Sequence, residues 1–195
     1  MKIGSNNSLT YLEPSSWWLK IFKKFTRHQR KDYEYQYIFC GVRFFDIRVS
    51  YDRNNRIVLK NGDRTYKVFS MYEIFDFFNK YCDVTVSFTL DESFKERMGD
   101  TNNGLENKFK DTCKVIETIY PGINFCGGYR RYDKKRIYEF KNGDPYIVDV
   151  DEFSKLYSFV TRFFPFMRKS FNNKYIEKFK YEEGFLVLNY VDYKA

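Results

Sequence analysis

The sequence predicts a single α/β domain that spans residues 1–195, and three observations support this class. Apolar segments typical of strands alternate with segments whose apolar residues recur at helical spacing. No internal repeat or low-complexity linker divides the chain. The 195 residues, 43% of them hydrophobic, are enough to bury a core of ordinary size.

The first half of the chain contains the clearest strand and helix patterns. An apolar run over 41–49 predicts a buried strand. Ser70 and Glu73 have the spacing of a capping box, which marks the beginning of a helix. This helix is expected to lead into a strand at 84–89. Its apolar stripe follows the i, i+3, i+4, i+7 pattern and consists of Ile74, Phe77, Phe78 and Tyr81.

The second half continues the alternation. Helical spacing of apolar residues predicts a helix over 105–119, which ends at a Pro-Gly pair, and another over 151–163, which ends before a proline. Short apolar runs at 123–127 and 146–149 are typical of strands. The basic segment 129–140 between these two strands is expected to form a hairpin or a loop.

Two charged residues interrupt the apolar strand over 41–49. Asp46 and Arg48 are two positions apart, so their side chains project from the same face of the strand. Burying both among apolar residues costs several kcal/mol unless they pair with each other or with a ligand. We therefore interpret this Asp-x-Arg pair as a candidate site.

Several short motifs follow the order found in one enzyme family. They are Gly4-Ser5-Asn6-Asn7-Ser8 within 3–11, Gln29, Gln36, Phe45-Asp46-Ile47-Arg48 within 41–49, and the segments 58–62, 84–91 and 186–190. Together they resemble the catalytic X domain of phosphatidylinositol-specific phospholipase C, a phosphoric diester hydrolase, and are closest to its metal-independent bacterial type. The resemblance implies an irregular, compact TIM (βα)8-type barrel, since a complete barrel usually takes about 250 residues. Between residues 93 and 184 no motif of the family is found.

The positions of the family's two catalytic histidines hold Asn6 and Asn61 in this chain. In the reaction that the resemblance implies, one histidine takes the proton from the inositol 2-hydroxyl and the other protonates the departing diacylglycerol oxygen. An asparagine amide does not titrate near neutral pH, so it cannot exchange a proton as imidazole does. General acid and general base each contribute roughly 10²–10⁴-fold to the rate. We therefore expect a catalytically impaired pseudoenzyme.

The other matched positions predict a phosphate site. Arg48 can offer a planar, bidentate donor to a phosphodiester, and Asp46 would orient that guanidinium or a ligand hydroxyl. The resemblance places Asn7 and Asp91 at the same pocket as substrate-binding residues. In the calcium-dependent branch of the family these four positions hold the metal ligands. Because an arginine occupies one of them here, we expect neither calcium nor another cofactor.

Other interpretations remain open. The single histidine, His28, lies in a basic stretch typical of a solvated turn, but it could act as a relocated general base. Lys60 could act as an acid, although neighbouring strand residues point to opposite faces. An active phosphodiesterase with an altered mechanism would use Asp46 or Asp91 as its base. The asparagine motifs also have the composition of ordinary turns, and the fold could serve a structural or interaction protein.

A net charge of +8 and a pI near 9.1 favour anionic partners. With the resemblance, this favours a phosphoester or phospholipid headgroup and an anionic membrane surface, whereas nucleic acid is not favoured. Family members carry a membrane-contacting helix early in the chain, and the alternative is a helix docked on the barrel. The residues concerned are aromatic and basic: Trp17, Trp18, Phe22, Lys20, Lys23 and Lys24.

Four cysteines lie far apart without a Cys-x-x-Cys pair, which favours buried free thiols over a zinc site, although a disulfide is compatible with the sequence. Neither a signal peptide nor a transmembrane segment is visible, so we expect a cytoplasmic protein with peripheral membrane contact. The abundance of Phe, Tyr, Lys, Asn and Ile suggests an AT-rich coding source such as a phage, a large virus or a low-GC bacterium.

Overall fold

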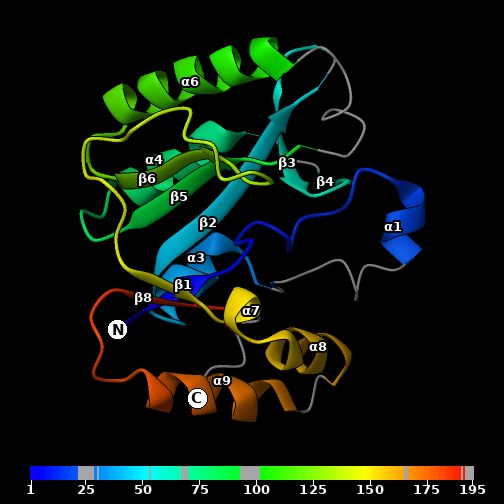
Figure 1. Cartoon of the computed structure of the whole chain (residues 1–195), viewed down its shortest axis with the longest axis vertical. Helices are drawn as coiled ribbons and strands as arrows, with labels where there is room; N and C mark the ends of the chain where they lie inside the picture. The colour runs from blue at the N-terminus through cyan, green and yellow to red at the C-terminus, as the bar shows by residue number, and fades with distance from the viewer. Residues whose placement is uncertain are drawn as a thin grey trace.

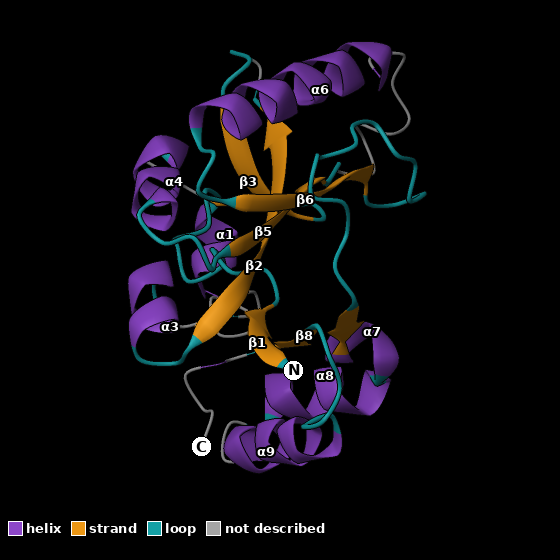
Figure 2. Cartoon of the chain, turned by 90° about the vertical axis from the view of Figure 1, so that its left-hand side faces the viewer, coloured by secondary structure: helices purple, strands orange, loops and turns teal. Residues whose placement is uncertain are grey.

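The computed structural model has a mixed α/β fold in which one curled sheet forms a half-barrel with helices around it (Figures 1 and 2). The α/β class and the irregular barrel expected from the sequence are therefore confirmed. The structure describes residues 1–21, 29, 31–52, 54–66, 70–92, 102–164, 167–189 and 191. His28 and Phe22 lie outside these described residues.

Six parallel strands form the main part of the sheet, in the spatial order β6-β5-β2-β1-β8-β7. Within the described ranges, β6 and β7 each pair on one side only, so the barrel stays open between them. The six strands are β1 (Lys2–Ser5), β2 (Val42–Tyr51), β5 (Thr85–Leu90), β6 (Asn124–Arg130), β7 (Ile147–Asp149) and β8 (Phe185–Leu188).

A short antiparallel hairpin extends the sheet. Its strands are β3 (Ile57–Asn61) and β4 (Arg64–Tyr66). β3 pairs with the carboxyl end of β2, beyond the residues of β2 that pair with β1. The hairpin thus brings 57–66 to the end of the sheet where β2 carries its charged residues.

Helices cover the convex face of the sheet and one end of it (Figure 2). Side chains of α3, α4 and α6 share one hydrophobic core with β2, β5 and β6, and α8 packs near β8. The described helices are α1 (Trp17–Ile21), α3 (Tyr33–Ile38), α4 (Met71–Asn79), α6 (Asn102–Ile119), α7 (Val150–Phe153), α8 (Lys155–Phe163) and α9 (Arg168–Lys178).

Strand β2 separates two different environments. Phe45, Ile47 and Val49 face the convex side and belong to the large core beneath the helices. The alternate residues face the concave side, where Phe44 packs in a small cluster with Val187 and others. Each large side chain buried in this way contributes roughly 1.5–3 kcal/mol. The concave face is apolar at the beginning of β2 and becomes polar two residues later.

Gly4 permits this apolar layer to close. A Cβ atom at this position would lie 2.8 Å from a Val187 methyl group and 3.1 Å from the Phe44 ring. Because glycine has no side chain, Phe44 and Val187 meet across β1. Two residues after Gly4, just beyond the end of β1, the side chain of Asn6 accepts a hydrogen bond from Arg48 in the polar layer.

The predicted helix over 70–81 is confirmed as α4, and Ser70 is its N-cap residue. Within the described part of the chain, however, the Ser70 hydroxyl makes no capping hydrogen bond. The prediction of a single helix over 151–163 is wrong, because the chain forms two helices, α7 and α8, with a break at Ser154. The Ser154 hydroxyl accepts a hydrogen bond from the backbone N–H of Tyr157, which caps the second helix.

Helix α9 has no counterpart in the sequence prediction. Its fully buried residues are Arg168 and Asn172, while Phe171, Tyr175 and Ile176 are partly buried against the core, so polar and apolar side chains share its inward face. A helix of this kind lacks the apolar stripe by which amphipathic helices are recognised. Asn172 meets Tyr157 of α8 through a 2.7 Å hydrogen bond between the tyrosine hydroxyl and the amide oxygen.

The loop after β6 covers the edge of that strand that does not face β5. The Arg130 N–H donates to the Lys135 carbonyl at 2.8 Å, and the Ile137 and Tyr138 N–H groups both donate to the Gly128 carbonyl at 2.9 Å. Gly128 has a φ of +71°, and a Cβ atom there would overlap the Tyr138 carbonyl oxygen. The strand predicted at 123–127 corresponds to β6, which extends as far as Arg130 and is longer than expected. Residues 131–138 form the expected loop.

The four cysteines are free thiols. Cys40, Cys113 and Cys126 are buried, as expected, whereas Cys82 is exposed. Burial raises the pKa of the Cys113 and Cys126 thiols well above the ordinary range, which makes both poor nucleophiles. None of the described helices combines the length and the apolar composition needed to cross a membrane.

Candidate functional site

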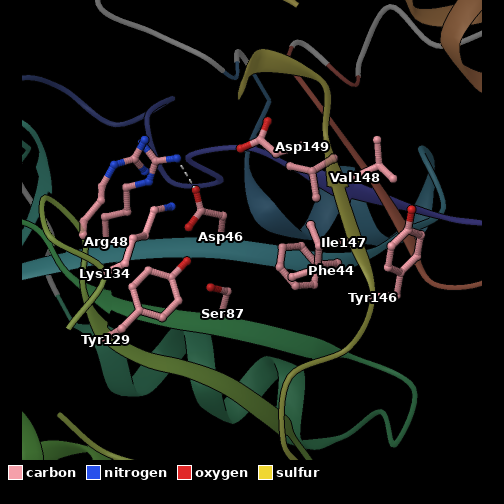
Figure 3. Close-up of a pocket in the computed structure, with 12 residues that line it drawn as sticks. Phe44, Asp46, Arg48, Ser87, Tyr129, Lys134, Tyr146, Ile147, Val148 and Asp149 are labelled. Carbon is pink, nitrogen blue, oxygen red and sulfur yellow. Dashed lines mark ion pairs between the residues drawn. The ribbon is translucent and has the colours of Figure 1, made fainter. Parts of the chain in front are cut away.

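A cavity of about 530 Å³ lies on the concave side of the sheet, next to the opening between β6 and β7 (Figure 3). This volume is within the range of small-molecule sites, roughly 300–1,000 Å³. Strands β2, β5 and β8 form its floor, and β6, β7 and the loop after β6 form its walls. Its lining residues include Phe44, Asp46, Arg48, Ser87, Tyr129, Arg131, Lys134, Tyr146, Ile147 and Asp149.

Asp46 and Arg48 lie together in this cavity, where the spacing along one strand predicted a shared face. An Arg48 Nη2 atom lies 2.6 Å from Asp46 Oδ2, and the two side chains are only 4% and 12% exposed. The Asp46 carboxylate also accepts a hydrogen bond of 3.2 Å from the backbone N–H of Asn7. The ion pair offsets the cost of burying each charge.

One donor of the Arg48 guanidinium forms no hydrogen bond with the described residues. Its Nε atom is buried and has no hydrogen-bond partner among the described residues. Burying a donor without a partner costs about 1–3 kcal/mol. Arg48 also lines the cavity, and a planar guanidinium is well suited to bind the oxygens of a phosphate there.

The side chain of Asn6 is held on three sides. Its Oδ1 atom accepts a 2.7 Å hydrogen bond from Arg48, while its Nδ2 atom donates to Asn189 Oδ1 at 3.1 Å and to Asp151 Oδ2 at 3.3 Å. Arginine can only donate, so the amide oxygen must face Arg48. Asn189 in turn donates to Asp151 at 2.8 Å. Asn6 therefore orients the guanidinium.

Sequence reasoning missed Asp151 and Asn189 as parts of this site. Asp151 was visible only as the expected beginning of a helix. Asn189 follows the apolar strand β8, and a buried polar residue at such a strand end was the one available signal. Asn189 is itself fixed through its backbone, because its N–H donates to the Tyr157 hydroxyl at 2.9 Å.

Gln29 and Gln36 support the turn that carries Asn6. Gln29 Nε2 donates to the carbonyls of Asn6 and Leu188, at 3.0 and 2.9 Å. Gln36 accepts from the Ser5 hydroxyl at 2.6 Å and donates to the turn at 3.0 Å. Both glutamines are fully buried, so the family-like motif residues hold the β1 turn rather than line the cavity.

Asn7 lies in the turn after β1, with a φ of +47° that asparagine tolerates better than most residues. Its amide atoms are buried without a hydrogen-bond partner among the described residues. The side chain lines a second cavity of about 10 Å³, roughly the size of one water molecule. Asp46, Arg48 and Lys60 line the same small space.

The hairpin after β2 places Lys60, and not Asn61, against the charged pair. Lys60 is 8% exposed and lines the small cavity, whereas Asn61 is half-buried and lines neither cavity. The pleat sends these two neighbours to opposite faces, as the sequence predicted, but the face toward the site is that of Lys60.

Asp91 lies at the end of β5, close to the same charges. Its carboxylate accepts a hydrogen bond of 2.9 Å from the backbone N–H of Gly62. Burial raises the pKa of Asp91 above its ordinary value of 3.8, and the charge of Asp46 adds to this. The Gly62 hydrogen bond and the charge of Arg48 oppose the shift. Asp91 thus holds its proton more tightly than an exposed aspartate.

The end of β6 and the loop after it contribute residues that the sequence did not single out as a site. Tyr129, Arg131 and Lys134 line the cavity. In Figure 3, Arg48, Lys134 and Tyr129 lie on one side of the cavity and Tyr146 lies on the other. The sequence signal was the cluster of basic residues in 129–140, which is more often a solvated surface than a site.

Comparison with known proteins gives a fold but no sequence family. Neither a protein-family model nor a curated protein matches the chain. Among solved structures, a mutant of the phosphatidylinositol-specific phospholipase C from Staphylococcus aureus is similar, with a TM-score of 0.59 and 15% identity, over 100% of this chain and 91% of that one.

The enzyme of the same name from Listeria monocytogenes is also similar, with a TM-score of 0.57, 12% identity, and coverage of 100% and 93%. A further Staphylococcus aureus structure, which concerns modulation of membrane binding, has a TM-score of 0.59, 13% identity, and coverage of 100% and 92%. At these identities the likeness establishes a fold similar to that of bacterial phosphatidylinositol-specific phospholipase C. The replacement of two histidines by Asn6 and Asn61 remains a prediction.

Proposed function

We propose that the protein binds a phosphoester of the inositol-phosphate type in the 530 Å³ cavity and is catalytically impaired as a phosphodiesterase. The observation that carries this proposal is the side chain of Arg48, which is buried beside Asp46 and lines the cavity. Hydrogen bonds to charged groups contribute roughly 1.5–3 kcal/mol each. The fold shared with bacterial phospholipases C supports this ligand class.

The groups around Arg48 favour binding over proton transfer. Asn6 uses its amide to orient the guanidinium and has no proton to exchange near neutral pH. The chain has one histidine, at position 28. Among the described residues, a phosphoester seated on Arg48 would therefore meet hydrogen-bond donors and acceptors but no imidazole.

Binding is tested by calorimetric titration with myo-inositol 1-phosphate. We expect Arg48→Gln to weaken binding about tenfold or more, because the charge-assisted hydrogen bond is lost. Arg43→Gln is the matched control, since Arg43 forms an ion pair of equal length, 2.6 Å, with Asp83 outside the cavity. Equal affinity for Arg48→Gln and the unchanged protein would refute the proposed site.

Catalysis is tested with phosphatidylinositol vesicles and a chromogenic inositol phosphodiester, with a bacterial phospholipase C as positive control. We expect turnover to be lower than that of the control enzyme by about four orders of magnitude or more, since two proton-transferring groups are missing. Turnover comparable to the control that vanishes in Arg48→Gln would contradict the pseudoenzyme proposal.

An active phosphodiesterase with an altered acid/base pair is the second candidate, and Asp91 is the observation that favours it. Its raised pKa lets a carboxyl group keep a proton closer to neutral pH, as a general acid or base requires. If the turnover assay shows activity, Asp91→Asn distinguishes the two cases. Activity that disappears in Asp91→Asn, with inositol-phosphate binding retained, would establish the altered mechanism.

We also propose contact with an anionic membrane surface. Trp17 and Trp18 of α1 stack at 3.8 Å and are 59% and 60% exposed. In α8, Leu156, Phe159 and Phe163 are exposed along one face, which is an unusual position for large apolar side chains. The net charge of +8 matches an anionic surface.

Flotation with anionic vesicles tests this contact. We expect binding that weakens in high salt and in Phe159→Ser, because both the charge and the apolar area contribute. Tyr181→Ser is the control, since Tyr181 is a 91% exposed aromatic residue outside α1 and α8. Absence of binding at every salt concentration would favour the structural or interaction protein.

A further inference from the structure

The tetrapeptide Lys-Asn-Gly-Asp occurs twice in the chain, at 60–63 and at 141–144. An asparagine that precedes a glycine can lose its side-chain amide, because the glycine has no Cβ to hinder attack of its backbone nitrogen on the neighbouring carboxamide. The two copies have the same local sequence, so a difference in their reactivity must come from the fold.

The first copy forms the tip of the β3–β4 hairpin. Asn61 is the last residue of β3 and pairs with Arg64 of β4, and Gly62 has a φ of +61°. The backbone N–H of Gly62 donates to Asp91 Oδ2 at 2.9 Å. A carboxylate thus accepts a hydrogen bond from the nitrogen that must lose its proton in order to act as a nucleophile.

The surroundings of Asp91 strengthen it as a base. Asp91 is 6% exposed and lies near Asp46 and Arg48 of β2 and Lys60 of β3. Burial raises the pKa of Asp91 above its ordinary value, and the hydrogen bond from Gly62 and the two cations oppose this shift only in part. A carboxylate that binds a proton more readily is a better general base.

The second copy has a different hydrogen-bond acceptor. Asn142 and Gly143 are exposed in the loop before β7, and Gly143 has a φ of +65°, close to that of Gly62. The backbone N–H of Gly143 donates to the Phe140 carbonyl at 3.1 Å. A backbone carbonyl is neutral and a far weaker base than a carboxylate. The second copy is therefore a matched reference for the first.

We propose that Asn61 is a site of self-catalysed deamidation, in which Asp91 acts as the general base. The Gly62 nitrogen forms a bond to Asn61 Cγ while its proton passes to Asp91. The bond between Cγ and Nδ2 of Asn61 then breaks, and the amide leaves as ammonia with the proton from Asp91. Water opens the resulting five-membered succinimide to aspartate or isoaspartate at position 61.

The reaction would change the hairpin that lies against the charged pair. It adds one negative charge to the residue next to Gly62, which contacts Asp91, and two neighbouring carboxylates repel each other. Isoaspartate also lengthens the backbone at the end of β3. The hairpin places Lys60 beside Asp46 and Arg48, so the modification would act on the edge of the phosphate site.

Peptide mapping by mass spectrometry tests the proposal on the full chain incubated near neutral pH. General base catalysis contributes roughly 10²–10⁴-fold, and the hairpin restricts the motion of Asn61, so we expect Asn61 to react about tenfold faster than Asn142 or more. In urea the two rates should be equal, because the tetrapeptides are identical. A rate at Asn61 equal to or below that at Asn142 in the folded protein would overturn the proposal.

Asp91→Asn replaces the base with an amide of the same shape. We expect it to slow the reaction of Asn61 about tenfold or more and to leave that of Asn142 unchanged. Asp83→Asn is the matched control, since Asp83 is 47% exposed and pairs with Arg43. Faster deamidation of Asn61 in Asp91→Asn would mean that the hydrogen bond protects the hairpin, and the proposal would fail.

The pH dependence of the unchanged protein gives a test that needs no variant. The rate at Asn142 should rise in proportion to hydroxide, because no carboxylate takes the proton from the Gly143 nitrogen. The rate at Asn61 should level off once Asp91 is ionised. Parallel pH profiles at the two sites would contradict the role of Asp91, whatever the stability of its variants.

Discussion

Replacing Arg48 with glutamine should lower the free energy of unfolding by about 3–5 kcal/mol, in addition to its effect on ligand binding. The substitution leaves the Asp46 carboxylate, which is 12% exposed, without its 2.6 Å cationic partner. It also removes the donor that holds the Asn6 amide at 2.7 Å. Urea unfolding followed by circular dichroism measures the loss.

Two further variants show whether burial causes this loss. Arg43→Gln breaks an ion pair of the same length, but its partners Arg43 and Asp83 are 28% and 47% exposed, so we expect a loss of about 1 kcal/mol or less. Asp46→Asn combined with Arg48→Gln should recover part of the stability, because no charge is then left unpaired. Similar losses for Arg43→Gln and Arg48→Gln would contradict the explanation.

Gly128→Ala is expected to destabilise the protein by about 2–5 kcal/mol, the sum of about 1–2 for a left-handed backbone and about 1–3 for overpacking. Gly128 has a φ of +71°, and an added Cβ would overlap the carbonyl oxygen of Tyr138. Since the overlapping atom belongs to the backbone, the loop after β6 would have to move. Thermal unfolding monitored by circular dichroism measures the effect.

Gly143 provides the control for backbone conformation. Its φ is +65°, close to that of Gly128, but a Cβ there would meet no atom of the described residues within 4 Å. Gly143→Ala should therefore cost only the conformational part, about 1–2 kcal/mol. If the two alanine variants were equally destabilised, close contact with Tyr138 would not explain the role of Gly128.

The sequence revealed those parts of the site that depend on local geometry. Asp46 and Arg48 share a face because the strand repeats every two residues, and this repeat is independent of the rest of the fold. The conformations of α4 and α6 likewise follow from short-range apolar spacing. The pairing of β1 with β2 places the turn that carries Asn6 beside the charged residues of β2.

The remaining parts depend on contacts between distant segments. Asn6 meets Asp151 and Asn189 across 145 and 183 residues, and no periodicity in the sequence reports such a contact. The same limit applies to Lys60, whose direction toward Asp46 depends on where the β3 hairpin joins β2. Pattern alone specified that Lys60 and Asn61 face apart, but not which of them faces the site.

The loop that covers β6 has a second consequence, for the behaviour of the protein in concentrated solution. An uncovered strand edge is a template for pairing with another molecule, and natural proteins protect such edges. Here the hydrogen bonds from Ile137 and Tyr138 to Gly128 occupy that edge. Shortening the loop would therefore expose this edge and promote self-association into larger species.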